Sequence, residues 1–240
     1  MIFFKNVNVS IGDKIILKNL SFNLEKNNIL AIIGESGGGK TTIANILMKK
    51  ISEYDGQVYL DDKEIRNYSN REYYNKISIV LQDYTTALNP CMTIRDVLYE
   101  PFEIKKEKVD YIKIKNVLNL LKLNYLDIDT KTIDLSGGEK QRVNIARILL
   151  FNPEVLIFDE SISSLDIDLQ IEIVEIIKKI SKNMNKTILF ITHNLSILKF
   201  LTRDILVIKD GSIIERGDVI NHPKSDYTKE LFYKWKKRLD

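Results

Sequence analysis

Cysteine is almost absent from this sequence, because Cys91 is the only one among 240 residues. An internal disulfide and a metal site built from several cysteines are therefore excluded. Such sparse use of cysteine is typical of proteins that work in a reducing cytoplasm.

The sequence also has no strong excess of positive or negative charge. The 36 lysine and arginine residues nearly balance the 33 aspartate and glutamate residues, which leaves a net charge of +3. This bias is too weak to indicate a nucleic-acid partner, and we expect none. Apolar residues make up 44% and charged residues 29%, as in ordinary globular domains. A chain of this length can bury a sizeable core without disulfides or metals.

Long hydrophobic runs are missing as well. No stretch approaches the roughly 18–20 apolar residues that are needed to cross a bilayer. The opening MIFFKNVNVSIGDK lacks the apolar stretch and the cleavage site of a signal peptide. If the protein works at a membrane, we expect another chain to provide the membrane-spanning part.

Two kinds of strand pattern are present. Apolar and polar residues alternate over 2–9 and 15–24, which predicts antiparallel strands at a sheet edge. Short continuous apolar runs are typical of central strands in a parallel sheet that is covered on both faces. These runs are Ile29–Ile33, Ile77–Leu81, Val155–Phe158 and Thr187–Ile191.

Helical periodicity follows several of these runs, at about 41–50, 168–183 and 195–202. The alternation of strands and helices predicts an α/β sandwich. The stretch from 85 to 150 interrupts the alternation with apolar residues at helical spacing, which predicts a helical insert. An amphipathic helix is predicted over 226–238, with Leu231, Phe232 and Trp235 on one side.

A glycine-rich motif lies between the first of these runs and the helix at 41–50. GESGGGKT, from Gly34 to Thr41, fits the P-loop pattern in its strand–loop–helix context. Its backbone N–H groups would face phosphate oxygens, Lys40 would reach the β- and γ-phosphates of ATP, and the Thr41 hydroxyl would bind Mg²⁺. The predicted nucleotide-binding residues here are Gly34, Glu35, Ser36, Gly37, Gly38, Gly39, Lys40, Thr41 and Thr42. The motif alone indicates only a P-loop NTPase.

Two acids end the strand VLIF. A P-loop site needs a carboxylate at the end of a neighbouring strand to hold Mg²⁺, and Asp159 fits that role. Glu160 is placed to orient the attacking water or to accept its proton. The alternative is a strand that simply meets solvent at acidic residues.

LSGGEKQR, from Leu135 to Arg142, lies between the P-loop and this acidic strand. At this point the sequence resembles the ABC ATPase family, whose signature motif is LSGGE. The resemblance implies an α/β P-loop NTPase core with an antiparallel β edge and a helical insert. It implies one ABC ATPase domain over 1–240, with the core in 1–84 and 151–240 and a helical signature subdomain in 85–150.

The signature motif opens a helix, and a helix start with two glycines can bind a phosphate. Ser136, Gly137, Gly138 and Glu139 are therefore predicted to contact ATP. Because the P-loop of the same chain already covers one nucleotide, a second ATPase subunit would supply this phosphate. The resemblance implies a head-to-tail dimer, either homomeric or heteromeric, with two ATP molecules at the interface. A capping box of Ser136 and Glu139 is the local alternative.

Further positions match the family by register. Gln82 resembles the Q-loop glutamine, which senses Mg²⁺ and water. Ser163–Asp166 resembles the D-loop, with Ser164 where alanine is common and with Asp166 predicted near the nucleotide. His193 resembles the switch histidine, which would contact the γ-phosphate; taken alone, it would be an ordinary histidine at a strand end.

One position departs from the family pattern. The family usually carries an aromatic residue near the N-terminus that stacks on adenine, and by register this place falls at Ile11. Since aromatic stacking on a base contributes roughly 1–3 kcal/mol, nucleotide affinity would be reduced, unless Phe3 or Phe4 substitutes.

The segment DYTTALNPCMTIRDVLYEPF and the later DYTK resemble the peptide/nickel importer ATPases. The resemblance implies permease subunits, an extracytoplasmic binding protein acting indirectly, and a peripheral location on the cytoplasmic face of the membrane. Oligopeptides, nickel and metal chelates remain open as cargo. An exporter ATPase, or a soluble ABC ATPase acting on DNA or ribosomes, is the alternative.

The same resemblance implies a groove after Gln82 that receives a cytoplasmic helix of a permease subunit. Tyr84, Leu88, Met92 and Tyr99 are the candidate apolar contacts. Packing inside the helical insert is an equally good explanation for these side chains.

Overall fold

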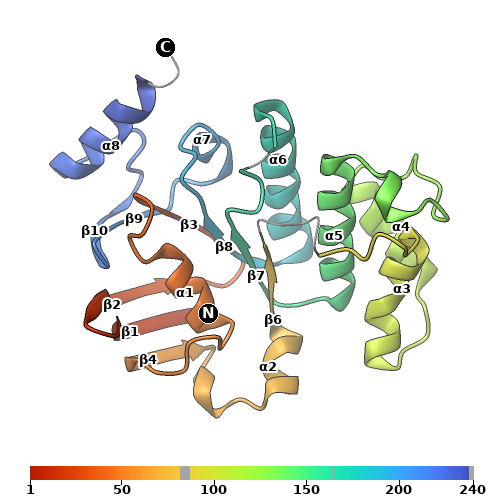
Figure 1. Ribbon diagram of the computed structural model, residues 1–240, viewed down its shortest axis with the longest axis horizontal. Helices are drawn as coiled ribbons and strands as arrows, with labels where there is room; N and C mark the ends of the chain where they lie inside the picture. Colours follow the sequence, from red (N-terminus) through yellow and green to blue (C-terminus); the bar gives the residue numbers. More distant parts are fainter. Residues whose placement is uncertain (82–86, 164, 238–240) are drawn as a thin grey trace.

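A computed structural model describes residues 1–81, 87–163 and 165–237 of the chain. Its centre is a six-stranded sheet in the order β10-β9-β3-β8-β7-β6, in which β9, β3, β8, β7 and β6 run parallel and β10 is antiparallel (Figure 1). The strands are β3 (Ile29–Ile33), β6 (Ile77–Val80), β7 (Val155–Asp159), β8 (Thr187–Ile191), β9 (Ile205–Lys209) and β10 (Ser212–Gly217). The four apolar runs found in the sequence are thus four adjacent parallel strands, in the order β3-β8-β7-β6.

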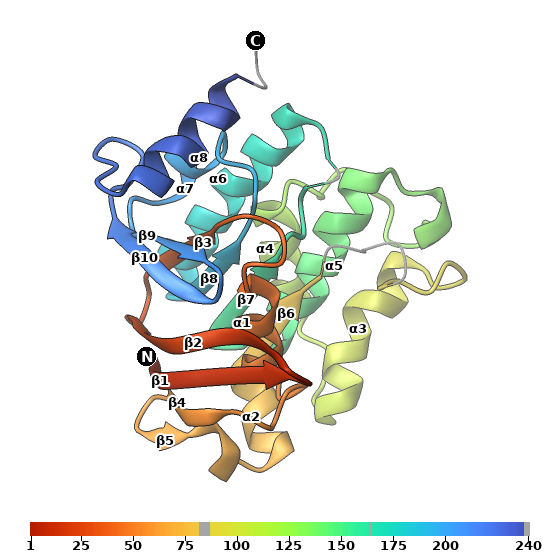
Figure 2. The same ribbon diagram turned by 60° about the vertical axis from the view of Figure 1, so that its left-hand side comes forward.

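A separate four-stranded antiparallel sheet has the order β2-β1-β4-β5 and lies below the first helix in Figures 1 and 2. Its strands are β1 (Ile2–Ile11), β2 (Lys14–Leu24), β4 (Asp55–Leu60) and β5 (Lys63–Glu64). The predicted antiparallel pair is confirmed as β1 and β2, paired from Ile2 with Leu24 to Ile11 with Lys14. The antiparallel edge of the six-stranded sheet itself is β10.

Helices cover both faces of the six-stranded sheet. They are α1 (Lys40–Leu47), α2 (Asn70–Lys76), α3 (Ile94–Lys105), α4 (Tyr111–Leu120), α5 (Gly137–Phe151), α6 (Ile167–Met184), α7 (Leu198–Leu201) and α8 (Asp226–Lys236), with short 3₁₀ turns at Ile65–Asn67 and Thr132–Asp134. No helix within the described ranges is both long and apolar enough to cross a membrane.

Strand periodicity decides which helix packs on which face. In β7, Val155 and Ile157 join the cluster that contains α1 and the antiparallel sheet, whereas Leu156 and Phe158 join the cluster that contains α5 and α6. Successive side chains of a strand point to opposite faces. Therefore α1 and α5 lie on opposite faces of the sheet.

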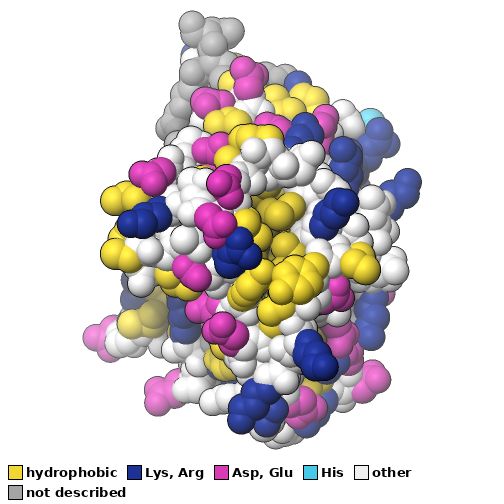
Figure 3. Space-filling model, turned by 90° about the vertical axis from the view of Figure 1, so that its right-hand side faces the viewer, with side chains coloured by type: hydrophobic (Ala, Val, Ile, Leu, Met, Phe, Trp, Pro, Cys, Tyr) yellow, Lys and Arg dark blue, Asp and Glu magenta, His cyan; other side chains and the backbone are white. Residues whose placement is uncertain are grey.

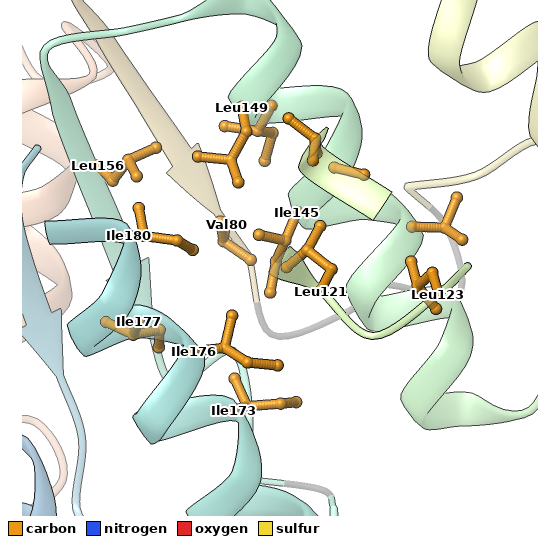
Figure 4. Packing of buried hydrophobic residues seen from close by; sticks show 14 of the residues in the cluster. Val80, Leu121, Leu123, Ile145, Leu149, Leu156, Ile173, Ile176, Ile177 and Ile180 are labelled. Carbon is orange, nitrogen blue, oxygen red and sulfur yellow. The ribbon is translucent and has the colours of Figure 1, made fainter. Parts of the chain in front are cut away.

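The largest apolar cluster joins the sheet to the helical insert. Figure 4 shows Val80 and Leu156 of the sheet packed between Ile177 of α6 and Leu149 of α5. Leu121, at the end of α4, is fully buried in the same cluster. This one cluster contains residues from both sides of the predicted boundary. The predicted division into a core and a subdomain over 85–150 stays a prediction. On the side that carries α3 and α4, hydrophobic side chains surround a hollow (Figure 3).

The helix predicted over 195–202 is mostly wrong, because only Leu198–Leu201 is helical. The Asn194 side chain accepts hydrogen bonds from the Ser196 amide at 3.0 Å and from the Ser196 hydroxyl, which fixes a turn in place of a first helical turn. At the other end, the Thr202 hydroxyl bonds to the Ile29 carbonyl at 2.9 Å. Helix α8 agrees with the prediction, since Phe232 is buried against the sheet with Leu231 and Trp235 beside it.

Candidate functional site

Three neighbouring parallel strands end at the same edge of the sheet. β3 leads into the P-loop, β8 leads into His193, and β7 ends at Asp159, which pairs with Ile191 of β8. The carboxyl ends of parallel strands are where α/β proteins bind ligands. The fold thus places the predicted P-loop, acidic pair and histidine together.

Close backbone packing holds the P-loop in place. A side chain at Gly34 would lie 2.1 Å from the carbonyl oxygen of Ile208, and Gly39 has a φ of 99°. The Gly211 amide donates to the Gly38 carbonyl at 3.3 Å, which ties the β9–β10 turn to the loop. These contacts fix the approach of the loop to α1, which begins at Lys40.

Lys40 lies folded against the loop that precedes it. Its Nζ donates to the carbonyl oxygens of Gly34 at 3.0 Å and Glu35 at 2.9 Å, and the side chain is 5% exposed. Burial lowers the pKa of Lys40, while the carboxylates of Glu160 and Asp159 act in the opposite direction. The ammonium group therefore sits at the helix start with two acids close by.

Asp159 is buried and incompletely paired. Its Oδ1 atom is buried and has no hydrogen-bond partner. Burial raises the pKa of the Asp159 carboxyl, and the Glu160 charge adds to the rise, whereas Lys40 and the Thr41 hydroxyl lower it. An unpaired buried carboxylate oxygen is costly unless a cation or a water satisfies it. Asp159 thus fits a metal ligand better than a strand end that meets solvent.

Glu160 and His193 lie against each other. The distance from His193 Nδ1 to Glu160 Oε2 is 3.3 Å. Glu160 has a φ of 49°, an uncommon conformation for a residue with a side chain, and its amide donates to the Ile191 carbonyl at 3.0 Å. Backbone strain of this kind often marks functional positions. The two predicted catalytic groups are adjacent and both reach solvent.

The signature residues open α5, as predicted. Ser136 caps the helix and accepts from the Glu139 amide at 3.3 Å, while Glu139 Oε2 accepts from the Ser136 amide at 2.8 Å. The Tyr125 hydroxyl donates to Glu139 Oε1 at 2.7 Å, and these hydrogen bonds lower the pKa of Glu139. The capping box is confirmed, and it pre-forms a helix start whose free N–H groups can meet an anion.

Other predicted site residues have mixed outcomes. Asp166 caps α6 by accepting from the Leu169 amide at 3.0 Å, so its side chain has a structural partner already. Gln82, Tyr84 and Ser164 lie outside the described residues. Leu88 is 4% exposed and packs in the core, so its predicted role as a surface contact is wrong. Met92 and Tyr99 are partly buried against that core as well.

The N-terminal residues considered for an adenine contact differ in their surroundings. Ile11 is 60% exposed at the end of β1. Phe4 is fully buried and stacks on Phe22 with ring centres 4.6 Å apart, so it cannot replace an aromatic at Ile11. Phe3 lies beside Tyr59 in the antiparallel sheet. Tyr227, which the sequence marked only as part of the DYTK segment and not as a nucleotide contact, lines a cavity beside the P-loop.

A phosphate-binding loop between a parallel strand and a helix, with acids at the end of a strand in the same sheet, defines a P-loop NTPase. A family model described as ABC transporter matches residues 17–163. The chain belongs to the ABC transporter family as a nucleotide-binding subunit whose activity is ATP hydrolysis coupled to transport.

Relatives and solved structures agree with this membership. The oligopeptide transport ATP-binding protein OppF of Streptococcus mutans is 33% identical over 225 residues, which cover 90% of this chain and 73% of that protein. The dipeptide transport ATP-binding protein DppF of Lactococcus lactis is 32% identical over 227 residues, with 90% and 73% covered.

Two solved structures share the fold. One is cbiO1 of Clostridium perfringens, part of the ABC transporter complex cbiONQ, with a TM-score of 0.82, 28% identity, and 99% of this chain and 92% of that chain covered. The other is the dimeric bacterial ABC transporter cassette MJ0796, with a TM-score of 0.74, 29% identity, and 90% and 97% covered.

Proposed function

We propose that this chain is the ATPase subunit of an importer of oligopeptides or dipeptides. The observation that carries the proposal is its similarity, at 32–33% identity over 90% of the chain, to subunits named for oligopeptide and dipeptide transport. The sequence resemblance also left nickel and metal chelates open as cargo, and nothing in the relatives' names favours them. The ATPase site itself carries no information about cargo, because it holds only the nucleotide.

ATP binds with its phosphates in the P-loop. The backbone amides of Gly37–Lys40 and the N-terminus of α1 face the β- and γ-phosphates, and the Lys40 ammonium moves from its loop carbonyls to those oxygens. Exchanging neutral carbonyl acceptors for charged phosphate oxygens is favourable in a buried site.

The buried, unpaired Oδ1 of Asp159 fits a site for Mg²⁺. Thr41 and Asp159 would hold the ion together with Gln82, and when bound it neutralises charge on the β- and γ-phosphate oxygens. The described residues contain no group of three or more His, Cys, Asp or Glu side chains that could hold a metal ion. A site completed by phosphates and water fits Mg²⁺, which usually keeps several waters.

Glu160 orients the attacking water and accepts its proton, and His193 stabilises the γ-phosphate. Their 3.3 Å contact keeps the imidazole beside the carboxylate. Glu160, with its left-handed backbone, directly follows the last residue of β7, at the sheet edge where the P-loop lies.

A second ATPase subunit completes each site. The start of α5 lies on the opposite face of the sheet from α1, so its free amides serve a nucleotide held by another chain. The dimeric cassette of the same fold supports this arrangement. ATP closes the dimer and hydrolysis reopens it, which moves the permease subunits because the two states differ in nucleotide affinity.

The permease contact lies in a groove of about 350 Å³ between α2, β6, α3 and α5. Its apolar lining includes Met48, Tyr74, Leu81 and Phe151. Arg147 and Glu100 form an ion pair at 3.4 Å in its wall. An amphipathic helix of a membrane subunit fits such a groove, and this contact would hold the chain at the cytoplasmic face of the membrane.

Uptake by cells that lack this chain tests the cargo. Loss of labelled di- and oligopeptide uptake, restored by the wild-type chain but not by Lys40→Ala, is the expected result, together with co-purification of two multispanning chains and an extracytoplasmic binding protein. Normal peptide uptake with lost nickel uptake would contradict the peptide assignment. Loss of efflux in place of uptake would favour an exporter.

A further inference from the structure

A cavity of about 440 Å³ adjoins the tip of the P-loop. Residues 35–38 form one wall, and Ile15 and Ile16 of β2 form an apolar second wall. The end of β9, the turn after it and the first turn of α8 close the far side with Lys209, Asp210 and Tyr227. A volume of this size lies within the range of small-ligand pockets.

Tyr227 is fixed in this cavity by contacts on several sides. Its hydroxyl accepts from the Glu35 amide at 3.3 Å, and Lys209 Nζ lies 4.7 Å from the ring centre. The turn before it is anchored by Glu215, whose carboxylate accepts from the amides of Lys224 at 2.8 Å and Ser225 at 3.0 Å. The tyrosine is thus preorganised beside the loop, where α8 runs past β10 (Figure 2).

The lining matches the chemistry of a nucleoside. Isoleucine and tyrosine side chains suit the flat faces of a base, and Lys14, Lys18 and Lys209 supply positive charge next to a polyphosphate. Tyr227 is the one aromatic residue among the described residues that line the cavity. When the phosphates of ATP lie in the P-loop, the nucleoside must extend beyond the tip of the loop. The cavity adjoins this tip.

We propose that Tyr227 forms the aromatic contact for the nucleoside of ATP, with Ile15 and Ile16 as the opposing apolar surface. The inference rests on the proposed binding of ATP phosphates at Lys40. It assigns to α8, a helix far along the chain from the P-loop, a direct part in nucleotide affinity. Base–aromatic stacking contributes enough to change affinity by about tenfold.

The competing explanation is that Tyr227 only supports the P-loop through its bond to the Glu35 amide. Two ligands separate these roles: Mg-ATP carries a base, and inorganic tripolyphosphate with Mg²⁺ does not. Two variants separate them as well, because Tyr227→Leu removes the ring face while Tyr227→Phe removes only the hydroxyl. Tyr233→Ala is the matched control, since Tyr233 is 60% exposed on the same helix and also carries a lysine over its ring.

Calorimetric binding to the purified full chain is the measurement. We expect Tyr227→Leu to weaken ATP binding about tenfold and to leave tripolyphosphate binding within about twofold. Tyr227→Phe and Tyr233→Ala should bind both ligands like the wild type. Equal weakening of both ligands by Tyr227→Leu, or weakening of both by Tyr227→Phe, would overturn the proposal in favour of P-loop support. Unchanged ATP affinity in Tyr227→Leu would overturn it outright.

The same experiment distinguishes this failure from failure of the proposed function. Lys40→Ala should weaken ATP and tripolyphosphate alike. If it weakens neither, the phosphate site at Lys40 is itself wrong. If it weakens both while Tyr227→Leu changes neither, ATP binds as proposed and only the assignment of Tyr227 falls.

Discussion

Individual glycines of the P-loop differ in how strongly the structure requires them. A Cβ atom at Gly34 would lie 2.1 Å from the Ile208 carbonyl oxygen, a backbone atom that cannot rotate away. At Gly37 no atom lies within 4 Å of the added carbon, and only its φ of 79° opposes substitution. Identical replacements at these two positions should therefore have different costs.

Gly34→Ala should lower the free energy of unfolding by more than about 3 kcal/mol, because the loop must separate from β9. Gly37→Ala should cost only about 1–2 kcal/mol, the usual strain of a left-handed residue with a side chain. Urea denaturation of both variants provides the comparison. Equal losses would show that the backbone contact with Ile208 does not hold the loop.

Asp61 joins three cationic groups at the edge of the antiparallel sheet. Lys26 lies 2.8 Å away, the N-terminal amino group 2.9 Å and Lys76 3.5 Å. Burial alone would raise the pKa of Asp61, but hydrogen bonds and charge from Lys26 and the amino group outweigh it and lower the pKa from 3.8 to about 2.

A carboxyl whose pKa is lowered by folding adds stability above its unfolded pKa and loses that contribution on acidification. The Asp61→Asn variant should therefore be less stable at pH 7, by about 1 kcal/mol or less for such an exposed network. The gap from the wild type should shrink as pH falls from about 4 toward about 2. Unfolding free energies across this range test it, with Asp62→Asn as the control. A gap that widens on acidification would contradict the assigned pKa.

At the scale of elements, α5 is stabilised at both ends by different means. Its start carries the Ser136–Glu139 capping box. Around its end, Lys113 and Lys105 donate to the carbonyls of Leu150 at 2.9 Å and Phe151 at 2.6 Å. Negative charge near the start and positive charge near the end both favour the helix dipole. The helix is thus stabilised at both ends, including the N-terminus that is proposed to receive a phosphate.

A second capping box, Thr93 with Asp96 at the start of α3, provides a matched comparison. Ser136→Ala and Thr93→Ala should each lower the free energy of unfolding by about 1 kcal/mol through loss of the cap. Only Ser136→Ala should also weaken ATP-dependent dimer formation. Thermal unfolding and sedimentation of both variants give the two readouts, and equal dimerisation defects would remove the special role of Ser136.

Elements with strong patterns could be predicted from the sequence, and those set by tertiary contacts could not. Continuous apolar runs identified β3, β6, β7 and β8, because strands covered on both faces need them. The strands β4, β9 and β10 were not predicted; β4 buries only Val58 and Leu60, and β10 has no buried residue, so their patterns are short and weak. The helix predicted over 195–202 was shortened by side-chain hydrogen bonds of Asn194, which periodicity does not reveal.

The residues of the candidate site also fall into those that motifs predicted and those that only tertiary contacts reveal. Motif spacing placed Lys40, Asp159, Glu160 and His193, because strand order brings their loops to one sheet edge. Tyr227 lies 192 residues from its hydrogen-bond partner Glu35, and no local pattern marks that contact. The core position of Leu88 likewise depends on how the insert packs.

For the whole molecule, the proposed coupling to a permease depends on the groove beside β6. Tyr74 is 41% exposed in this groove, whereas Ile104 is 62% exposed on α3 and does not line it. Tyr74→Glu should abolish co-purification with permease subunits and leave the ATPase rate of the isolated chain near that of the wild type. A charge buried in an apolar contact without a partner typically costs several kcal/mol.

Ile104→Glu is the control for the groove and should retain the complex. If both substitutions leave the complex intact, the groove is not the docking site. If both disrupt it, the contact surface extends across the outer face of the helical insert shown in Figure 3.

The central claim is that the edge formed by the P-loop, Glu160 and His193 hydrolyses ATP. Parallel measurements of ATP affinity and ATP turnover for Glu160→Gln test it most directly, since the amide keeps the shape of the side chain but cannot accept the proton of water. We predict ATP affinity within about threefold of the wild type and turnover reduced by roughly 100-fold or more. Turnover near the wild-type rate would contradict the assignment of Glu160 and the mechanism built on it.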